Sequence, residues 1–106
     1  EKIIADGKAV ADAGAFAMVA EGILEPIAIS LTNSVDVPVI GIGASAHCDG
    51  QVLVTEDMLG MFERTARFVK RYHNISENIE QAVASYASEV RSRSFPAAEQ
   101  LYQPKK

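Results

Sequence analysis

Glu21 is the residue of this chain most suited to acid–base chemistry. It ends an apolar run from Ala15 that has the composition of a strand, and strand alternation puts Ala15, Ala17, Val19 and Glu21 on one face. Small residues followed by a carboxylate suit the interior of a barrel, with the acid at the mouth where barrel enzymes bind substrate. A carboxylate in a partly apolar pocket gains proton affinity and can act as a general base. The pattern therefore predicts Glu21 as a catalytic residue.

The same strand leaves a simpler interpretation open. Phe16, Met18 and Ala20 fall on the opposite face, and we predict that Phe16 and Met18 pack against outer helices. On pattern alone, Glu21 is equally compatible with a solvated glutamate in a strand-to-helix loop. We interpret the nearby Glu25 as a solvated glutamate of this kind.

A second candidate is the glycine turn Gly41-Ile42-Gly43, which ends a β-branched strand predicted from Val37 to Ile42. Glycines just past a buried strand let the backbone approach a ligand closely, because no Cβ intervenes. A dinucleotide-binding fingerprint would require a helix directly afterwards, but Ala46 leads into a polar loop. The turn therefore indicates the edge of a small-molecule pocket, and a purely structural tight turn is the alternative.

The polar loop His47-Cys48-Asp49 also contains residue types that bind metals. Side chains of adjacent residues diverge and do not converge easily on one ion, and a nucleophilic Cys48 would need a base that adjacency alone does not supply. We interpret the loop as a turn at Asp49-Gly50 and predict no metal ligands in it. The acidic pair Glu56-Asp57 is interpreted as the first turn of a following helix.

The elements that position these residues follow from apolar spacing and from glycine and proline signals. We predict helices at 3–13, 26–32, 62–72 and 77–93, and strands at 15–21, 37–42 and 51–54. Asn74 and Glu77 could form a capping box at the start of the last helix.

The order of these elements predicts an α/β protein with a parallel sheet. Strands as uniformly apolar as these are normally covered on both faces, and the predicted helices are too few to do so. We therefore expect residues 1–94 to be the C-terminal strands and helices of an incomplete βα-barrel, followed by a polar tail at 95–106. A whole (βα)8 barrel takes about 250 residues.

Composition restricts the class of protein. The 106 residues suffice for one small domain, and the net charge of −4 with a pI near 5.1 gives no footprint for nucleic acid. The basic residues Arg64, Arg67, Lys70 and Arg71 are interpreted as the solvated face of a helix.

No apolar run could span a membrane, and the single cysteine fits a reducing cytoplasm. Because the chain begins at Glu1, we expect an N-terminal part to lie elsewhere.

Three motifs together resemble the ketopantoate hydroxymethyltransferase family. They are the run Val37 to Ala44, the run Asp49 to Val54, and Asp57-Met58-Leu59-Gly60. Upstream, Ala13-Gly14-Ala15-Phe16 leading to Val19-Ala20-Glu21-Gly22 is similar to the family's sixth strand with its catalytic glutamate. Downstream, Phe95-Pro96 with Glu99 resembles the family's ending.

The resemblance implies the C-terminal part of a (βα)8 TIM barrel of the phosphoenolpyruvate/pyruvate type, in a homo-oligomer that is usually a decamer. The implied reaction transfers a hydroxymethyl group from 5,10-methylenetetrahydrofolate to 2-oxoisovalerate with Mg²⁺, and gives ketopantoate for pantothenate synthesis. Glu21 would take the proton from C3 of the keto acid. Gly41, Ile42 and Gly43 would form backbone walls of the substrate pocket.

The chain also departs from the family pattern. The family's metal ligands lie in the N-terminal half, which is absent here, so the resemblance implies that this segment is inactive alone. Pro26 is shifted from the family's usual proline position, which leaves open a shared role for Glu25. Two alternatives remain: another keto-acid barrel of the lyase type, and a non-catalytic assembly fragment. In the second alternative, the apolar residues Ile79, Val83, Tyr86 and Val90 would serve subunit contacts.

Overall fold

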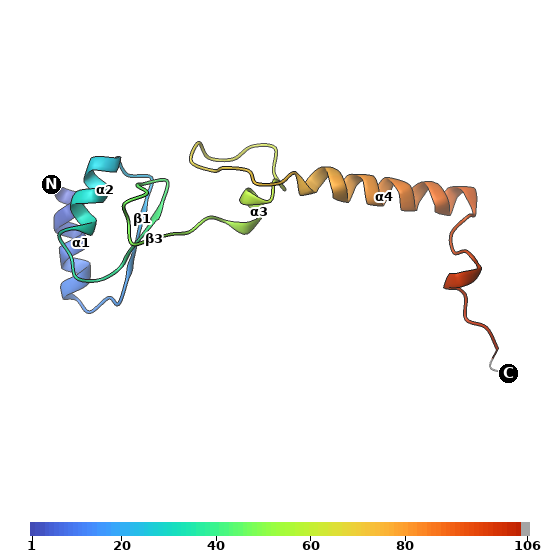
Figure 1. Ribbon diagram of the computed structural model, residues 1–106, viewed down its shortest axis with the longest axis horizontal. Coiled ribbons are helices and arrows are strands. Elements are labelled where there is room, and N and C mark those ends of the chain that lie inside the picture. Colours follow the sequence, from blue (N-terminus) through green and yellow to red (C-terminus); the bar gives the residue numbers. More distant parts are fainter. Residues whose placement is uncertain (105–106) are drawn as a thin grey trace.

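The chain is elongated, with an α/β unit at its N-terminal end and a long isolated helix towards its C-terminal end (Figure 1). The computed structural model describes residues 1–104. The Cα radius of gyration is 23.7 Å and the principal extents are 72 × 34 × 17 Å, whereas a compact domain of this length has a radius of about 13 Å. The described residues therefore do not enclose one common core.

The α/β unit alternates helices and strands, as the sequence predicts. Its elements are α1 (Lys2–Asp12), β1 (Met18–Glu21), α2 (Glu25–Thr32), β2 (Val39–Ile42) and β3 (Gly50–Gln51). The three strands form a parallel sheet in the order β1-β2-β3. β1 and β2 pair from Met18↔Val39 to Glu21↔Ile42, so their carboxyl ends are level. The predicted α/β class and parallel sheet are confirmed.

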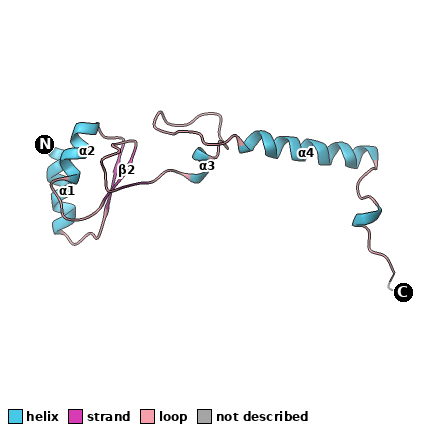
Figure 2. Ribbon diagram, viewed as in Figure 1, coloured by secondary structure: helices cyan, strands magenta, loops and turns pink. Residues whose placement is uncertain are grey.

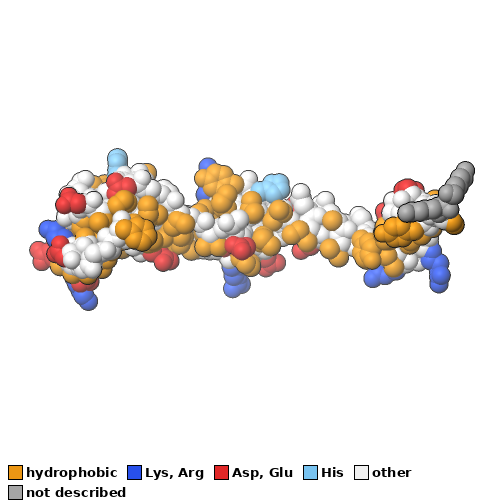
Figure 3. Space-filling view, turned by 90° about the horizontal axis from the view of Figure 1, so that it is seen from below, with side chains coloured by type: hydrophobic (Ala, Val, Ile, Leu, Met, Phe, Trp, Pro, Cys, Tyr) orange, Lys and Arg blue, Asp and Glu red, His pale blue; other side chains and the backbone are white. Residues whose placement is uncertain are grey.

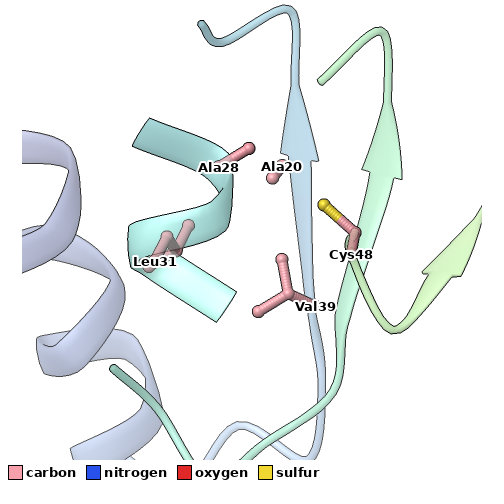
Figure 4. Close-up of a cluster of buried hydrophobic side chains, with 5 residues drawn as sticks. All are labelled: Ala20, Ala28, Leu31, Val39 and Cys48. Carbon is pink, nitrogen blue, oxygen red and sulfur yellow. The ribbon is translucent and has the colours of Figure 1, made fainter. Parts of the chain in front are cut away.

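The core of this unit is small and lies on one face of the sheet, against α2 (Figure 4). Its buried members are Ala20, Ala28, Leu31, Val39 and Cys48. α1 packs on α2 at Gly7, where any side chain would collide with Leu31. Met18 packs partly against this core, as predicted. Phe16 precedes β1 and is 93% exposed, so its predicted packing against helices is wrong.

Within residues 1–104, the opposite face of the sheet is open at β1, whereas Ile40 and Ile42 of β2 are half-buried. Val19 is 63% exposed, and Glu21 is exposed beside it. Figure 3 shows exposed hydrophobic side chains at both ends and in the middle of the molecule. Burying such surface contributes about 25 cal/mol per Å², so this apolar surface favours covering by further protein.

The third predicted strand is shorter than expected. β3 covers only Gly50–Gln51, and Val54 is already the N-cap of α3 (Thr55–Met58). After Gln51 the chain leaves the sheet and runs away from the α/β unit (Figure 1). Glu56 and Asp57 lie in the first turn of a helix, as predicted, but this helix is α3 and not the one predicted at 62–72.

The helix predicted over 62–72 is wrong, because the segment between α3 and α4 is an irregular loop (Figure 2). Gly60 turns the chain with a φ of +76°. The far end of the loop is then held by α3, since Tyr72 N donates to Met58 O at 2.7 Å and Ile75 N donates to Leu59 O at 2.9 Å. The basic residues between 64 and 71 therefore lie on a loop and not on a helix face.

The last predicted helix is confirmed as α4 (Ile75–Ser92), but its start differs in detail. Asn74 is the N-cap without a side-chain cap bond, and its Oδ1 accepts from Ser76 Oγ at 3.0 Å instead. The capping box predicted with Glu77 is therefore not formed. α4 has no buried residue, and a short 3₁₀ turn at Ala98–Gln100 (η1) follows it. No helix within residues 1–104 is long and apolar enough to cross a membrane.

Candidate active site

Glu21 and the glycine turn lie side by side at the carboxyl ends of β1 and β2. Glu21 is the register partner of Ile42, and the next amide, Gly22 N, donates to Ile42 O at 2.9 Å. Because Ala20 is buried under α2, strand alternation directs Glu21 to the open face of the sheet. The structure thus brings together two candidates that are far apart in the sequence.

The two glycines of the turn have different surroundings. A Cβ on Gly41 would lie 3.1 Å from both Cys48 Sγ and Gln51 Nε2, so this glycine makes room for packing within the unit. Gly43 has a φ of +61°, and a Cβ there would lie 2.5 Å from the ring of Phe68. Gly43 therefore lets the distant loop pack directly on the end of β2.

The residues of the polar loop 47–49 lie in three different environments. Asp49 Oδ2 accepts from Val39 N at 2.8 Å and so fixes the start of β2. Cys48 is a free, buried thiol in the core, whereas His47 is exposed. Among residues 1–104, no group of three or more histidine, cysteine, aspartate or glutamate side chains could hold a metal ion.

Sequence reasoning missed a polar network around Ser45, which is buried. Ser45 Oγ donates to Glu25 Oε1 at 3.3 Å and accepts from His47 N at 3.1 Å. The carbonyl oxygen of Ser45 accepts from Gln51 Nε2 at 2.6 Å. Glu25 is thus more than the solvated glutamate that we predicted, because it links the start of α2 to the loop after β2.

A cleft of about 380 Å³ adjoins Gly43 on the side of the distant loop. Its walls are the end of β2, the chain after β3, and one side of the loop between α3 and α4. The residues that line it are Gly43, Gln51, Val52, Leu53, Met58, Phe68, Lys70 and Tyr72. The sequence did not reveal this cleft, because we interpreted Phe68, Lys70 and Tyr72 as parts of a helix.

A second, mostly apolar cleft of about 430 Å³ runs along β1 beside Glu21. Ile3 and Val10 of α1, Val19 and Glu21 of β1, and Leu31 of α2 are among its lining residues. In the described sheet, β1 is an edge strand paired only with β2. An unpaired, apolar edge strand is a place where a further strand can add.

The fold and the site define an α/β protein that gathers its candidate binding groups at the carboxyl ends of parallel strands, the usual location of such sites. Residues 1–98 match the family described as "Ketopantoate hydroxymethyltransferase". The chain therefore belongs to the ketopantoate hydroxymethyltransferase family, and the resemblance seen in its motifs is confirmed.

Relatives named 3-methyl-2-oxobutanoate hydroxymethyltransferase match almost the whole chain. The protein of Erythrobacter litoralis is 68% identical over 105 residues, which are 99% of this chain and 36% of that protein. The protein of Novosphingobium aromaticivorans is 64% identical over 104 residues, or 98% of this chain and 36% of the relative. The protein of Maricaulis maris is 55% identical over 106 residues, which are 100% of this chain and 38% of that protein. The chain thus spans little more than a third of the length of these relatives.

Proposed function

We propose that the complete protein transfers a hydroxymethyl group from 5,10-methylenetetrahydrofolate to 2-oxoisovalerate and forms ketopantoate for pantothenate biosynthesis. Family membership and the names of the relatives support this activity. The observation that supports the site is the level pairing of Glu21 with Ile42, which puts a carboxylate beside the glycine turn. The compartment that we propose is the cytoplasm, and the free thiol of Cys48 fits it.

The proposed chemistry begins with proton removal by Glu21. Its carboxylate takes the proton from C3 of the keto acid, and the electron pair left on C3 forms the bond to the methylene carbon of the donor. The two bonds from the methylene carbon to N5 and N10 of the donor break, and water supplies the hydroxyl group of the product. Tetrahydrofolate leaves with one proton on each of these nitrogens, one from C3 by way of Glu21 and one from the water. Gly41, Ile42 and Gly43 would provide backbone walls for the keto acid at the carboxyl end of β2, beside Glu21.

Mg²⁺ is also part of the proposal, but we assign its ligands to residues outside this chain. A divalent ion of this kind prefers several oxygen ligands in octahedral geometry, and residues 1–104 contain no cluster of three or more suitable side chains. Bound to the keto acid, Mg²⁺ would act as a Lewis acid and stabilise negative charge on the substrate oxygen.

We further propose that the sheet is part of a (βα)8 barrel of the phosphoenolpyruvate/pyruvate type. The open face with Val19 and Glu21, the unpaired edge of β1 and the adjoining apolar cleft all support a continuation of the sheet by another segment. The chain matches 36% of the Erythrobacter litoralis protein, and the rest of that relative is long enough to supply the remaining strands of a barrel. In such a barrel, Glu21 would point into the interior at the mouth.

A chimera tests the proposed activity. Replacing the matching segment of the Erythrobacter litoralis protein by this chain should give an enzyme that forms ketopantoate only when 5,10-methylenetetrahydrofolate is present. The chain by itself should form none. A folded chimera that turns over keto acid without the folate donor would favour the lyase-type alternative, and a folded but inactive chimera would contradict the proposal.

A second role, in assembly, is favoured by the exposed apolar face of α4. Ile79, Val83, Tyr86 and Val90 recur on this face and are each at least 44% exposed. We propose that this face packs on a second copy of the protein in a homo-oligomer, with a decamer as the expected form. Burial of such a face would give a large part of the free energy of association.

Val83→Asp in the complete enzyme should reduce the mass of the assembly, because a buried, unpaired carboxylate opposes association. The measurement is sedimentation equilibrium, and Ser85→Asp is the matched control because Ser85 is exposed on the opposite side of α4. An unchanged assembly mass for Val83→Asp would contradict an intersubunit role of this face.

A further inference from the structure

We infer that the cleft beside Gly43 binds the one-carbon donor of the proposed reaction, through an aromatic ring and a carboxylate of that donor. The inference rests on the proposed function, because it names residues that hold the second substrate. The residues that carry it are Phe68, Lys70 and Tyr72, on the loop between α3 and α4.

The position of the cleft suits a second substrate. Gly43 belongs both to the cleft and to the turn that adjoins Glu21 across the β1–β2 pair. A donor in the cleft would therefore lie next to the keto-acid pocket, as transfer between two bound substrates requires. The cleft has a volume of about 380 Å³, at the lower end of the range for small-molecule sites. This volume suits one ring system with its substituent.

The side chains of the cleft suit a flat, negatively charged ligand. Phe68 and Tyr72 offer aromatic faces that are 37% and 64% exposed, and aromatic rings stack favourably in offset or edge-to-face geometry. Lys70 is the cation among the residues that line the cleft, and its Nζ lies 4.9 Å from the centre of the Tyr72 ring. A folate donor has both of the required features, aromatic rings and glutamate carboxylates.

The neighbouring cation Arg71 is less suited to this task. Its Nη2 donates to Glu63 O, and it lines a different cleft together with the carboxylates Glu77 and Glu80. These acidic neighbours oppose the binding of a further carboxylate. Lys70 is therefore the residue to which we assign the anionic part of the donor.

The loop is held in the position that forms the cleft. Phe68 packs directly over Gly43, and Tyr72 N donates to Met58 O. Because both ends of the aromatic wall are fixed to other elements, little ordering remains to be done when a ligand binds. Such preorganisation favours affinity.

Kinetics of the Lys70→Gln variant of the complete enzyme test the inference. We expect the KM for 5,10-methylenetetrahydrofolate to rise about tenfold, as loss of a charge-assisted contact predicts, while the KM for the keto acid stays the same. Arg67→Gln is the matched control, because Arg67 is an exposed cation of the same loop outside this cleft and should leave both KM values unchanged. Tyr72→Leu should raise the donor KM, and Tyr72→Phe should restore it.

A donor analogue without the glutamate part, a methylenetetrahydropteroate, separates charge recognition from structural damage. With this analogue, the parent enzyme and Lys70→Gln should have the same KM. An unchanged folate KM in Lys70→Gln, or an equal increase with the analogue, would overturn the inference. Failure of the proposed function would be distinct, because the parent enzyme itself would then not consume the folate donor.

Discussion

Glu21→Gln in the complete enzyme is expected to slow proton exchange at C3 of the keto acid by at least about 10²-fold, the usual contribution of a general base. An amide cannot accept the proton, yet it has nearly the shape of the carboxylate. Glu21 lies at the exposed end of β1 and pairs with Ile42 only through the backbone, so the substitution should leave the sheet intact. Exchange of the C3 proton with solvent deuterium, followed by NMR, measures the effect without requiring the folate donor.

Glu25→Gln is the control that the chain itself offers. Glu25 is also a glutamate near the end of β1, but its Oε1 accepts a hydrogen bond from Ser45 Oγ, which the amide oxygen of glutamine can also accept. We expect exchange in this variant to stay within about threefold of the parent, as is usual for substitutions that preserve contacts. Near-normal exchange in Glu21→Gln would refute the assignment of Glu21, and a comparable loss in Glu25→Gln would instead give Glu25 a share in the chemistry.

Prediction from the sequence worked where local patterns determine the structure. The helices near Ile3 and Val83 follow from apolar spacing and became α1 and α4 with nearly the expected bounds. Alternation along β1 also predicted the opposite faces of Ala20 and Glu21, because period-2 geometry is intrinsic to a strand. The parallel pairing followed from the order of elements.

The sequence did not predict features that depend on distant partners. Phe62, Ala66, Val69 and Tyr72 have helical spacing, but Tyr72 N bonds to Met58 O in α3 and the segment is a loop. The contact between Gly43 and Phe68 and the bond from Ser45 to Glu25 likewise join segments far apart in the chain. No local pattern encodes such contacts, so the cleft beside Gly43 became visible only in three dimensions.

Gly43→Ala in the complete enzyme is expected to lower the free energy of unfolding and to raise the KM for the folate donor about tenfold or more, because each 1.4 kcal/mol of lost binding is a factor of ten. Gly43 has a φ of +61°, which costs an L-residue about 1–2 kcal/mol. In addition, the new Cβ would lie 2.5 Å from the ring of Phe68. Since the ring must move, the aromatic wall of the donor cleft moves with it.

Gly22→Ala separates the backbone cost of a positive φ from the collision with Phe68. Gly22 has nearly the same φ, +60°, and nothing described lies within 4 Å of the Cβ that it would gain. Both variants should carry the backbone cost in denaturant unfolding, but only Gly43→Ala should carry the further cost of displacing Phe68. Gly14→Ala, with a φ of +95° and open space around its Cβ, lies outside the candidate site and serves as the control for donor KM. Equal unfolding free energies for Gly43→Ala and Gly22→Ala, together with an unchanged donor KM, would mean that the contact between Phe68 and Gly43 does not shape the cleft.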